Sequence, residues 1–385
     1  MQVDQFNIRH LAAMAAAVRL GSVSRAAEAV NLTQPAATQG IAKLEAQLGL
    51  ALFERRATGM AATEAALRLV PRVEAALRLI GSNRVTAAQL RAFVALAQHG
   101  SYPAAAQVAG VTVSSLHRAV GDLGLALGQR LVDRRGRGLV LTHHGAQVAR
   151  RLRLALAELR AGVEDLGELL GRSAGRISVG AMPLCRARLL PHAINAFRRA
   201  HAGIDILIHE GARGELVGPL RDGEIDLMIG ALRHPDTLGP DLVQVPLFDD
   251  RPTIIGRAGH PLAAETERLA MLHRYGWIVP SEGTPLRTLW QNLFAAIGGP
   301  LPPVPIECGS VMTIRELLQA GDELTLLSVD QLAIELAAGI LVDLGPAPGA
   351  VTRTIGITHR ADWRPTRAQA GFLALLQASA QALYT

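Results

Sequence analysis

The chain has 385 residues, of which 49% are hydrophobic and 19% charged, so it is long enough for several globular domains and too apolar for a disordered protein. No stretch approaches the roughly eighteen uninterrupted apolar residues of a membrane helix, and the first residues lack the apolar core of a secretory signal. The two cysteines lie far apart in apolar segments, which favours reduced core thiols. We therefore expect a cytoplasmic protein that does not associate with a membrane.

Charge is distributed unevenly along the chain. Residues 1–172 contain 21 Lys and Arg against 12 Asp and Glu, whereas residues 173–385 contain 18 against 21. The net charge of +6 therefore combines a basic first part with a slightly acidic second part. This asymmetry favours a polyanion-binding region joined to a domain of another kind. A solvated surface whose charges differ by chance is the alternative.

The first part contains an internal repeat at one fixed offset of 79 residues, without gaps. Chance matches of Ala are expected in this Ala-rich chain, but matches of Gly-Ser, Thr and Arg-Arg in one register are not. Two copies are too few for a solenoid, so the repeat predicts a duplicated domain. The matches are Leu11 with Leu90, Gly21-Ser22 with Gly100-Ser101, Ala26-Ala27 with Ala105-Ala106, Thr33 with Thr112, Leu44 with Leu123, Leu52 with Leu131, Arg55-Arg56 with Arg134-Arg135, and Thr63 with Thr142.

The first copy has the pattern of a winged helix-turn-helix. Apolar residues recur at helical spacing, and Gly21 ends the first helix. Thr33 is placed to cap a third helix, whose apolar face points to the core and whose polar face points outward. The predicted elements are helices at residues 8–20, 24–30 and 33–48, a strand at 52–53 and a basic hairpin tip at 55–59.

The third helix carries side chains that suit the reading of DNA bases. Gln34 and Gln39 can pair with adenine in the major groove, and Thr38 can contact a thymine methyl group or a phosphate. An Arg pair on the wing can bind phosphates or enter the minor groove. A helical bundle with a solvated polar face is the alternative. The candidate DNA-binding residues of this copy are Thr33, Gln34, Pro35, Thr38, Gln39, Lys43, Arg55 and Arg56.

Residues 6–64 resemble the DNA-binding domain of LysR-type transcriptional regulators. The resemblance implies that Gln34, Pro35, Thr38 and Gln39 supply groove contacts and that Arg55 lies on the wing. It implies no cofactor, no metal and no catalytic residue. The residues that carry it are Ala26-Ala27, Leu32-Thr33-Gln34-Pro35-Ala36-Ala37-Thr38, Ile41, Leu44-Glu45, Leu48-Gly49 and Leu52-Phe53-Glu54-Arg55.

The second copy departs from this pattern at the base-reading positions. Gln34-Pro35 is replaced by Val113-Ser114, and Thr38-Gln39 by His117-Arg118. Gly121 and Gly124 each weaken the helix by about 1 kcal/mol relative to Ala. We predict that this copy mainly binds the phosphate backbone of DNA. His117 and Arg118 could still contact guanine. Its candidate DNA-binding residues are Ser114, His117, Arg118, Arg134, Arg135 and Arg137.

Two further helices follow the two copies. Residues 142–170 have apolar residues at spacings of three and four and predict one helix of on the order of 40 Å. In the LysR resemblance this helix pairs with that of a second subunit, and packing within the chain is the alternative. Residues 63–80 are shorter, contain Pro71 and are interpreted as a connector.

The second part alternates strands with helices, which predicts a parallel sheet. It resembles the two-lobed effector domain of LysR-type regulators, a type 2 periplasmic-binding fold, and in detail the galactose-binding-protein regulators. The expected fold class is α/β overall, with two winged helix-turn-helix modules. The predicted domains are 1–62 and 84–141 for the two modules, 63–83 and 142–174 for the connecting and dimerisation helices, and 175–385 for the effector domain, with lobe one at 175–249 and 346–385 and lobe two at 250–345.

Ligands in such folds lie beyond the carboxyl ends of strands, near the N-termini of helices. Ser281, Thr284 and Ser310 can bind a sugar hydroxyl or an anion, and Arg186 or Arg213 can hold a carboxylate. Surface capping is the alternative for each residue alone. The candidate effector-binding residues are Pro183, Arg186, Arg213, Ala231, Ser281, Thr284, Ser310 and Met312.

These patterns favour a regulator over an enzyme or a solute receptor. The sequence lacks a P-loop, a G-x-S-x-G motif, an H-E-x-x-H motif and Cys/His metal spacing. We expect a DNA-binding transcriptional regulator that binds double-stranded DNA and a sugar or small carboxylate and forms a homodimer or homotetramer. An architectural or co-regulatory protein with weak site specificity is the alternative.

Overall fold

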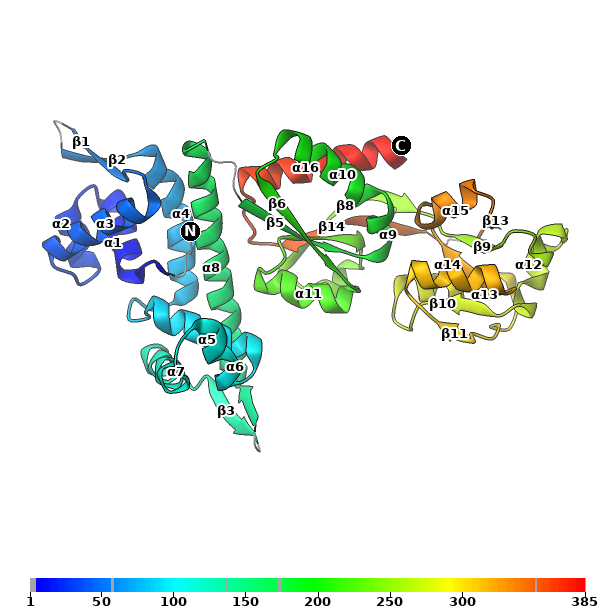
Figure 1. The fold of residues 1–385 in the computed structure, drawn as a ribbon, viewed down its shortest axis with the longest axis horizontal. Coiled ribbons are helices and arrows are strands. Elements are labelled where there is room, and N and C mark those ends of the chain that lie inside the picture. The colour runs from blue at the N-terminus through cyan, green and yellow to red at the C-terminus, as the bar shows by residue number, and fades with distance from the viewer. Residues whose placement is uncertain (1–4, 57–58, 136–137, 172–174, 350–351, 385) are drawn as a thin grey trace.

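The computed structural model describes residues 5–56, 59–135, 138–171, 175–349 and 352–384. Two small helical modules flank a pair of long helices, and a two-lobed α/β domain extends from this pair (Figure 1). Across the described ranges, no helix is both long enough and apolar enough to cross a bilayer. The predicted fold class is confirmed.

The first module starts each helix with a side chain that caps it. Asn7, Ser22 and Thr33 accept hydrogen bonds from backbone N–H groups in the following turns. Gly49 ends the third helix at a φ of 70°, in the left-handed region that Gly adopts without strain. The elements are α1 (Ile8–Leu20), α2 (Val23–Ala29), α3 (Gln34–Leu48), β1 (Phe53–Arg56) and β2 (Gly59–Ala62).

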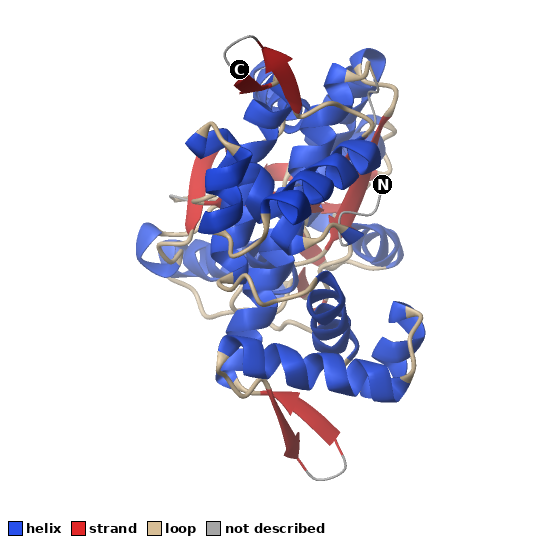
Figure 2. Cartoon of the chain, turned by 90° about the vertical axis from the view of Figure 1, so that its left-hand side faces the viewer, coloured by secondary structure: helices blue, strands red, loops and turns tan. Residues whose placement is uncertain are grey.

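The second module repeats this design. Thr86, Ser101 and Thr112 cap its helices, and Gly128 ends the third helix at a φ of 64°. The wing of each module is an antiparallel hairpin that projects from the helices (Figure 2). The elements are α5 (Ala87–His99), α6 (Tyr102–Ala109), α7 (Val113–Leu127), β3 (Val132–Arg135) and β4 (Gly138–Leu141).

The helices that follow the modules, α4 (Glu64–Ile80) and α8 (His143–Leu169), pack against each other (Figure 1). Leu69 near the start of α4 faces Gly162 near the end of α8, whereas Leu79 accepts a hydrogen bond of 2.9 Å from Arg151. The pair is therefore antiparallel. The apolar face for which we expected a second subunit is packed against α4 of the same chain, and this pair shares one hydrophobic core with both modules.

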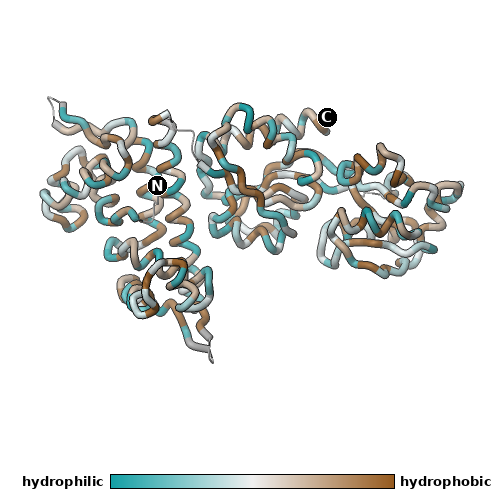
Figure 3. The backbone as a smooth tube through the Cα atoms, viewed as in Figure 1, coloured by the Kyte–Doolittle hydropathy of each residue, from teal (hydrophilic) through white to brown (hydrophobic). Residues whose placement is uncertain are grey.

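Lobe one of the α/β domain is a five-stranded sheet in the order β6-β5-β7-β14-β8. Its strands include some of the most apolar stretches of the chain (Figure 3). Cys185 lies in this core, and burial raises the pKa of its thiol to about 12. The elements are β5 (Gly175–Ala181), α9 (Pro183–Ala187), α10 (Leu189–Ala200), β6 (Ile204–Glu210), α11 (Arg213–Asp222), β7 (Leu227–Ala231), β8 (Leu242–Asp250), β14 (Arg353–Arg360) and α16 (Arg367–Tyr384).

Lobe two is a second five-stranded sheet, in the order β11-β10-β12-β9-β13, around Trp277, Trp290 and Phe294. The chain enters this lobe after β8 and returns to lobe one before β14. The elements are β9 (Thr253–Arg257), α12 (Arg268–Met271), β10 (Trp277–Val279), α13 (Pro285–Ile297), β11 (Ile306–Glu307), α14 (Val311–Ala320), β12 (Leu324–Leu327), α15 (Ala333–Ala337) and β13 (Leu341–Pro346).

The prediction of a wholly parallel sheet is wrong, because each sheet is mixed. In lobe one β5 runs parallel to β6 and β7, but β14 runs antiparallel to β7 and β8. In lobe two β9 runs antiparallel to β12 and β13. The reversed strands are those next to the crossings between lobes, where the chain no longer follows a strand-helix-strand unit.

Candidate DNA-binding surface and effector cleft

Helix α3 of the first module separates an apolar inner face from a polar outer face. Ala37, Ile41, Leu44 and Leu48 are buried against the module core. The hydroxyl of Thr33 accepts the backbone N–H of Ala36, so this residue acts as the N-cap. On the outer face the side chains are exposed and can reach a groove. The candidate residues on it are Gln34, Pro35, Thr38, Gln39 and Lys43.

The wing of the first module is attached to α3 by Glu45. Its carboxylate accepts the backbone N–H groups of Leu52 and Phe53 at 2.8 and 3.2 Å. This contact sets where β1 starts relative to the recognition helix. Arg55 on β1 is exposed, and Arg56 is the last residue of the strand. The first wing therefore carries the exposed Arg55 on the strand that Glu45 joins to α3.

The second module presents a different surface at the equivalent positions. Val113 on α7 is 46% exposed where the first module has a Gln, and Leu125 is 82% exposed. The ring of His117 packs against that of Tyr102, with centroids 4.9 Å apart and planes tilted by 38°. Arg118 is exposed on the same helix. The outer face of α7 thus carries an apolar residue and an imidazole engaged with Tyr102, where α3 carries three polar side chains.

The wing of the second module lacks the carboxylate anchor, because Gly124 replaces Glu45. The backbone contact is kept, since the Gly124 carbonyl accepts the N–H of Gln129 at 2.9 Å as the Glu45 carbonyl accepts that of Leu50 at 3.3 Å. Ser114, another candidate residue, lies 3.1 Å from the Thr112 hydroxyl at the start of α7. Of the basic candidates on this wing, Arg134 and Arg135 belong to β3, and Arg137 lies outside the described residues.

A cavity of about 270 Å³ lies between the two lobes of the α/β domain. It is formed by the carboxyl end of β7, the start of α11 and the start of α13, together with Arg353 on β14. Four of the predicted effector-binding residues line it, and they come from segments up to about a hundred residues apart. These four are Pro183, Arg213, Ala231 and Thr284.

The other predicted effector residues lie outside the cavity lining. Arg186 forms an ion pair with Glu210, and Met312 is 71% exposed. Ser310 caps α14 by accepting the N–H of Thr313 at 3.4 Å. Ser281 is exposed beside the cavity, and its carbonyl accepts a hydrogen bond from Thr284.

Arginine side chains dominate the electrostatics of the cavity. Within the described part of the chain, Nη1 of Arg213 and Nη2 of Arg353 are buried without a hydrogen-bond partner. Burial, followed by the charges of Arg233 and Arg221, lowers the pKa of Arg213. Burial also lowers the pKa of Arg233. Of the described residues, three arginines and one carboxylate, Glu282, line the cavity, and guanidinium nitrogens without a partner are suited to a negatively charged ligand.

Sequence reasoning missed Arg233 and Arg353. The signal for Arg233 was available, because it follows the end of β7, where ligands of such folds bind. Arg353 gave no such signal, because its strand was not predicted. Its Nε donates to Asp250 at 2.7 Å, and this nearly buried pair orients the guanidinium group.

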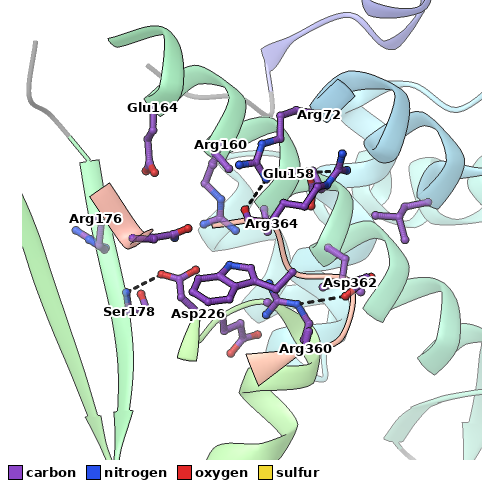
Figure 4. Close-up of a pocket in the computed structure, with 18 residues that line it drawn as sticks. Arg72, Glu158, Arg160, Glu164, Arg176, Ser178, Asp226, Arg360, Asp362 and Arg364 are labelled. Atoms are coloured by element: carbon purple, nitrogen blue, oxygen red, sulfur yellow. Dashed lines mark hydrogen bonds and ion pairs between the residues drawn. The ribbon is translucent and has the colours of Figure 1, made fainter. Parts of the chain in front are cut away.

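A network of charged side chains joins the helix pair to lobe one (Figure 4). Arg72 on α4 is 7% exposed and contacts Glu158 and Asp165 on α8, each at 3.3 Å. It also donates to the backbone carbonyl of Arg364 at 2.7 Å. Nearer the start of α8, Arg150 pairs with Asp241 of lobe one at 2.9 Å. These contacts join lobe one directly to the helices that carry the modules.

Beside this network lies a cavity of about 280 Å³, which Glu164 and Asp226 line together. Burial, followed by the nearby charge of Asp226, raises the pKa of Glu164 to about 7. Burial also raises the pKa of Asp226, whose carboxylate accepts the N–H of Ser178 at 2.8 Å. No local pattern predicts this contact between domains, because its residues are up to 292 positions apart.

Comparison with family models places both halves of the chain. The model of the LysR substrate binding domain matches residues 170–381. The model of the bacterial regulatory helix-turn-helix protein of the lysR family matches twice, at residues 8–67 and 87–146. The duplication deduced from the sequence is thus found as two separate matches to one model.

Similar proteins are transcriptional regulators. The HTH-type transcriptional regulator GalR of Pseudomonas putida is 33% identical over 390 residues, which cover 98% of each chain. The regulator PcaQ of Agrobacterium fabrum is 27% identical over 285 residues, which cover 74% of this chain and 91% of that protein. A full-length OxyR variant of Pseudomonas aeruginosa has the same fold over 76% of this chain and 94% of its own, with a TM-score of 0.56 and 24% identity.

Proposed function

This chain belongs to the LysR family of bacterial transcriptional regulators, and on that premise we propose that its first module reads the DNA sequence while its interlobe cavity binds a small carboxylate. Regulators of this family bind DNA and effectors and form oligomers, and they are not enzymes. Action on chromosomal DNA supports the expected cytoplasmic location. A homodimer or homotetramer is the proposed assembly.

The exposed polar face of α3 is the observation that supports base reading by the first module. Gln34, Thr38 and Gln39 are exposed on the first half of this helix. Their amide and hydroxyl groups match the donors and acceptors that adenine and thymine present in the major groove. The second module has Val113 and His117, whose ring packs against Tyr102, at two of these positions. The two modules therefore divide the work, the first reading bases and the second holding the DNA backbone.

A footprint of the full chain on DNA selected from a random library tests this role. We expect Gln34→Ala to weaken binding to the selected sequence by about 10- to 100-fold, because a bidentate contact contributes about 1–3 kcal/mol of discrimination. His117→Ala is the matched control and should leave base preference unchanged. Loss of preference in His117→Ala alone would contradict the assignment. Weak preference in the unmodified chain would favour an architectural protein.

The effector is proposed to be a small carboxylate because guanidinium groups line the interlobe cavity. Arg213 and Arg233 lie on one side of it, and Arg353 contributes a buried Nη2 atom without a partner among the described residues. A carboxylate satisfies such donors and offsets both the burial and the neighbouring charges of Arg233 and Arg221 that lower the pKa of Arg213. The resemblance to galactose-binding-protein regulators supports a sugar as the second candidate, which would use the polar groups at the start of α13.

Thermal unfolding of the full chain with small monocarboxylates, dicarboxylates and neutral hexoses distinguishes these effectors. A ligand at a hundred times its Kd should stabilise the protein by about 2.7 kcal/mol. Arg213→Ala should abolish the shift produced by the active carboxylate. Arg186→Ala is the matched control, because Arg186 pairs with Glu210 away from the cavity lining. A shift with hexoses alone would overturn the carboxylate proposal.

A further inference from the structure

The antiparallel pair of α4 and α8 has the contact pattern of a two-fold interface, although both helices belong to one chain. At the offset of 79 residues, Arg72 corresponds to Arg151, and Leu79 corresponds to Glu158. In the structure Arg72 contacts Glu158 at 3.3 Å, and Arg151 donates to the carbonyl of Leu79 at 2.9 Å. Exchanging the two copies therefore exchanges one contact for the other. This reciprocity is the mark of an interface between two equivalent subunits.

The seam between α4 and α8 is a hydrophobic core of almost completely buried side chains. Leu69 and Val73 of α4 and Leu152 and Leu159 of α8 are at most 2% exposed and belong to one cluster. Gly162 lies so close to Leu69 that an added Cβ atom would approach it within 2.9 Å. This packing holds the two modules in a fixed relation, because each is joined to one end of the pair.

The two recognition helices lie at opposite ends of this pair. Both α3 and α7 lie on the side of the molecule away from the two-lobed domain (Figure 1). Viewed from that side, the two wings project at opposite ends of the assembly (Figure 2). A single duplex running along this side can meet both modules, whereas the two-lobed domain stays behind them.

We propose that one chain is by itself a two-headed DNA-binding unit, which occupies two neighbouring segments of the same duplex at a fixed spacing. The proposal rests on the proposed function of the first module. Two identical heads related by a two-fold axis read a palindrome. Here the heads differ, so each unit occupies one segment with preferred bases and one segment held only through its backbone. The DNA partner of one chain is an asymmetric site.

The test compares the number of protected DNA segments with the number of bound chains. The full chain is bound to DNA selected from a random library, the mass of the complex gives the number of chains, and hydroxyl-radical footprinting gives the number of protected segments. We expect two protected segments for every bound chain. One of the two segments should have preferred bases. Insertion of about half a helical turn between the two segments should weaken binding, because the helix pair fixes their spacing. One segment for every chain would overturn the proposal.

Surface variants assign each segment to a module. Arg118→Ala on the exposed face of α7 should reduce protection of the segment without preferred bases and lower the salt slope of binding by about one. Arg199→Ala, an exposed cation on α10, is the matched control and should change neither value. Unchanged protection in Arg118→Ala, together with one segment per chain, would place the second module off the DNA.

The same footprints separate this proposal from the role of the first module. If Gln34→Ala keeps the preferred bases while two segments per chain remain, the proposed reading residue is wrong and the two-headed unit stands. If Gln34→Ala loses the preferred bases while only one segment per chain is protected, the reading residue stands and the two-headed unit is wrong.

Discussion

The two helix-turn-helix modules keep the same fold but present different surfaces to a partner. Thr33 and Thr112 cap the third helix of their module, and Leu44 and Leu123 are completely buried at equivalent positions. The exposed positions diverge, from Gln34 in the first module to Val113 in the second. Caps and core residues are retained because each module must fold, whereas surface residues change when only one module has to read bases.

The helices that follow the modules differ in the same way. α4 and the first part of α8 are equivalent and pack against each other. The last turns of α8 have no counterpart in α4. They contain Glu164, which lines the cavity beside lobe one, and Asp165, which pairs with Arg72. The duplication thus produced a symmetric seam, and the extension of one helix adds to the contacts that Arg72 and Arg150 make with the effector domain.

The largest expected effect tests whether the two modules contribute equally to stability. Leu44→Ala and Leu123→Ala should each lower the free energy of unfolding by about 2–5 kcal/mol, since both side chains are completely buried. Denaturant unfolding measures this loss. Only the first variant should also reduce base preference in a footprint at conditions where the protein stays folded. A negligible loss in Leu123→Ala would mean that the second module is dispensable for folding.

A graft tests whether surface residues alone separate the modules. The combined change of Val113→Gln, Ser114→Pro, His117→Thr and Arg118→Gln gives α7 the reading face of α3. We expect the second protected segment to acquire a base preference worth about 1–3 kcal/mol for each bidentate contact. Selection from a random library measures it. If no preference appears, the backbone of the second module, with Gly124 in place of Glu45, positions its helix differently.

A pH series tests the part of α8 that has no counterpart in α4. Burial and Asp226 raise the pKa of Glu164 to about 7, so the folded state favours the protonated form. Its contribution to stability is full below the unfolded pKa near 4.5 and is lost as the pH rises through about 7. The free energy of unfolding should therefore fall as the pH rises from about 4.5 to about 7, by an amount on the order of 1 kcal/mol after solvent screening, and Tm should fall with it. Glu164→Gln should flatten this fall, and an unchanged slope would contradict the assignment.

The smallest expected effect concerns the two glycines that distinguish α7 from α3. Gly121→Ala should stabilise the second module by about 0.5–1 kcal/mol, because Ala favours a helix and the added Cβ meets no atom within 4 Å. Gly124→Ala should lack this gain, because its Cβ would lie 2.9 Å from the carbonyl oxygen of Gln129. Denaturant unfolding of both variants checks the difference. An equal gain would show that the turn after α7 adjusts freely.

The sequence by itself determined the duplicated modules, their caps and the polar face of α3. Capping by Thr33, the stop at Gly21 and the apolar period of each helix depend on residues within a few positions of one another. The strand-helix alternation of residues 175–231 was readable for the same reason. Strand β14 could not be predicted in this way, because its place between β7 and β8 depends on the return of the chain from lobe two.

Only the tertiary structure decided which surfaces face each other. The apolar stripe of α8 demanded a partner, but its residues alone could not say whether that partner was a second subunit or α4. Likewise, contacts between distant segments bring Arg213, Arg233 and Arg353 to one cavity. They also place Arg72 of α4 against the backbone of lobe one. Local patterns specify elements, whereas the pairing of buried faces is settled by the packing of the whole chain.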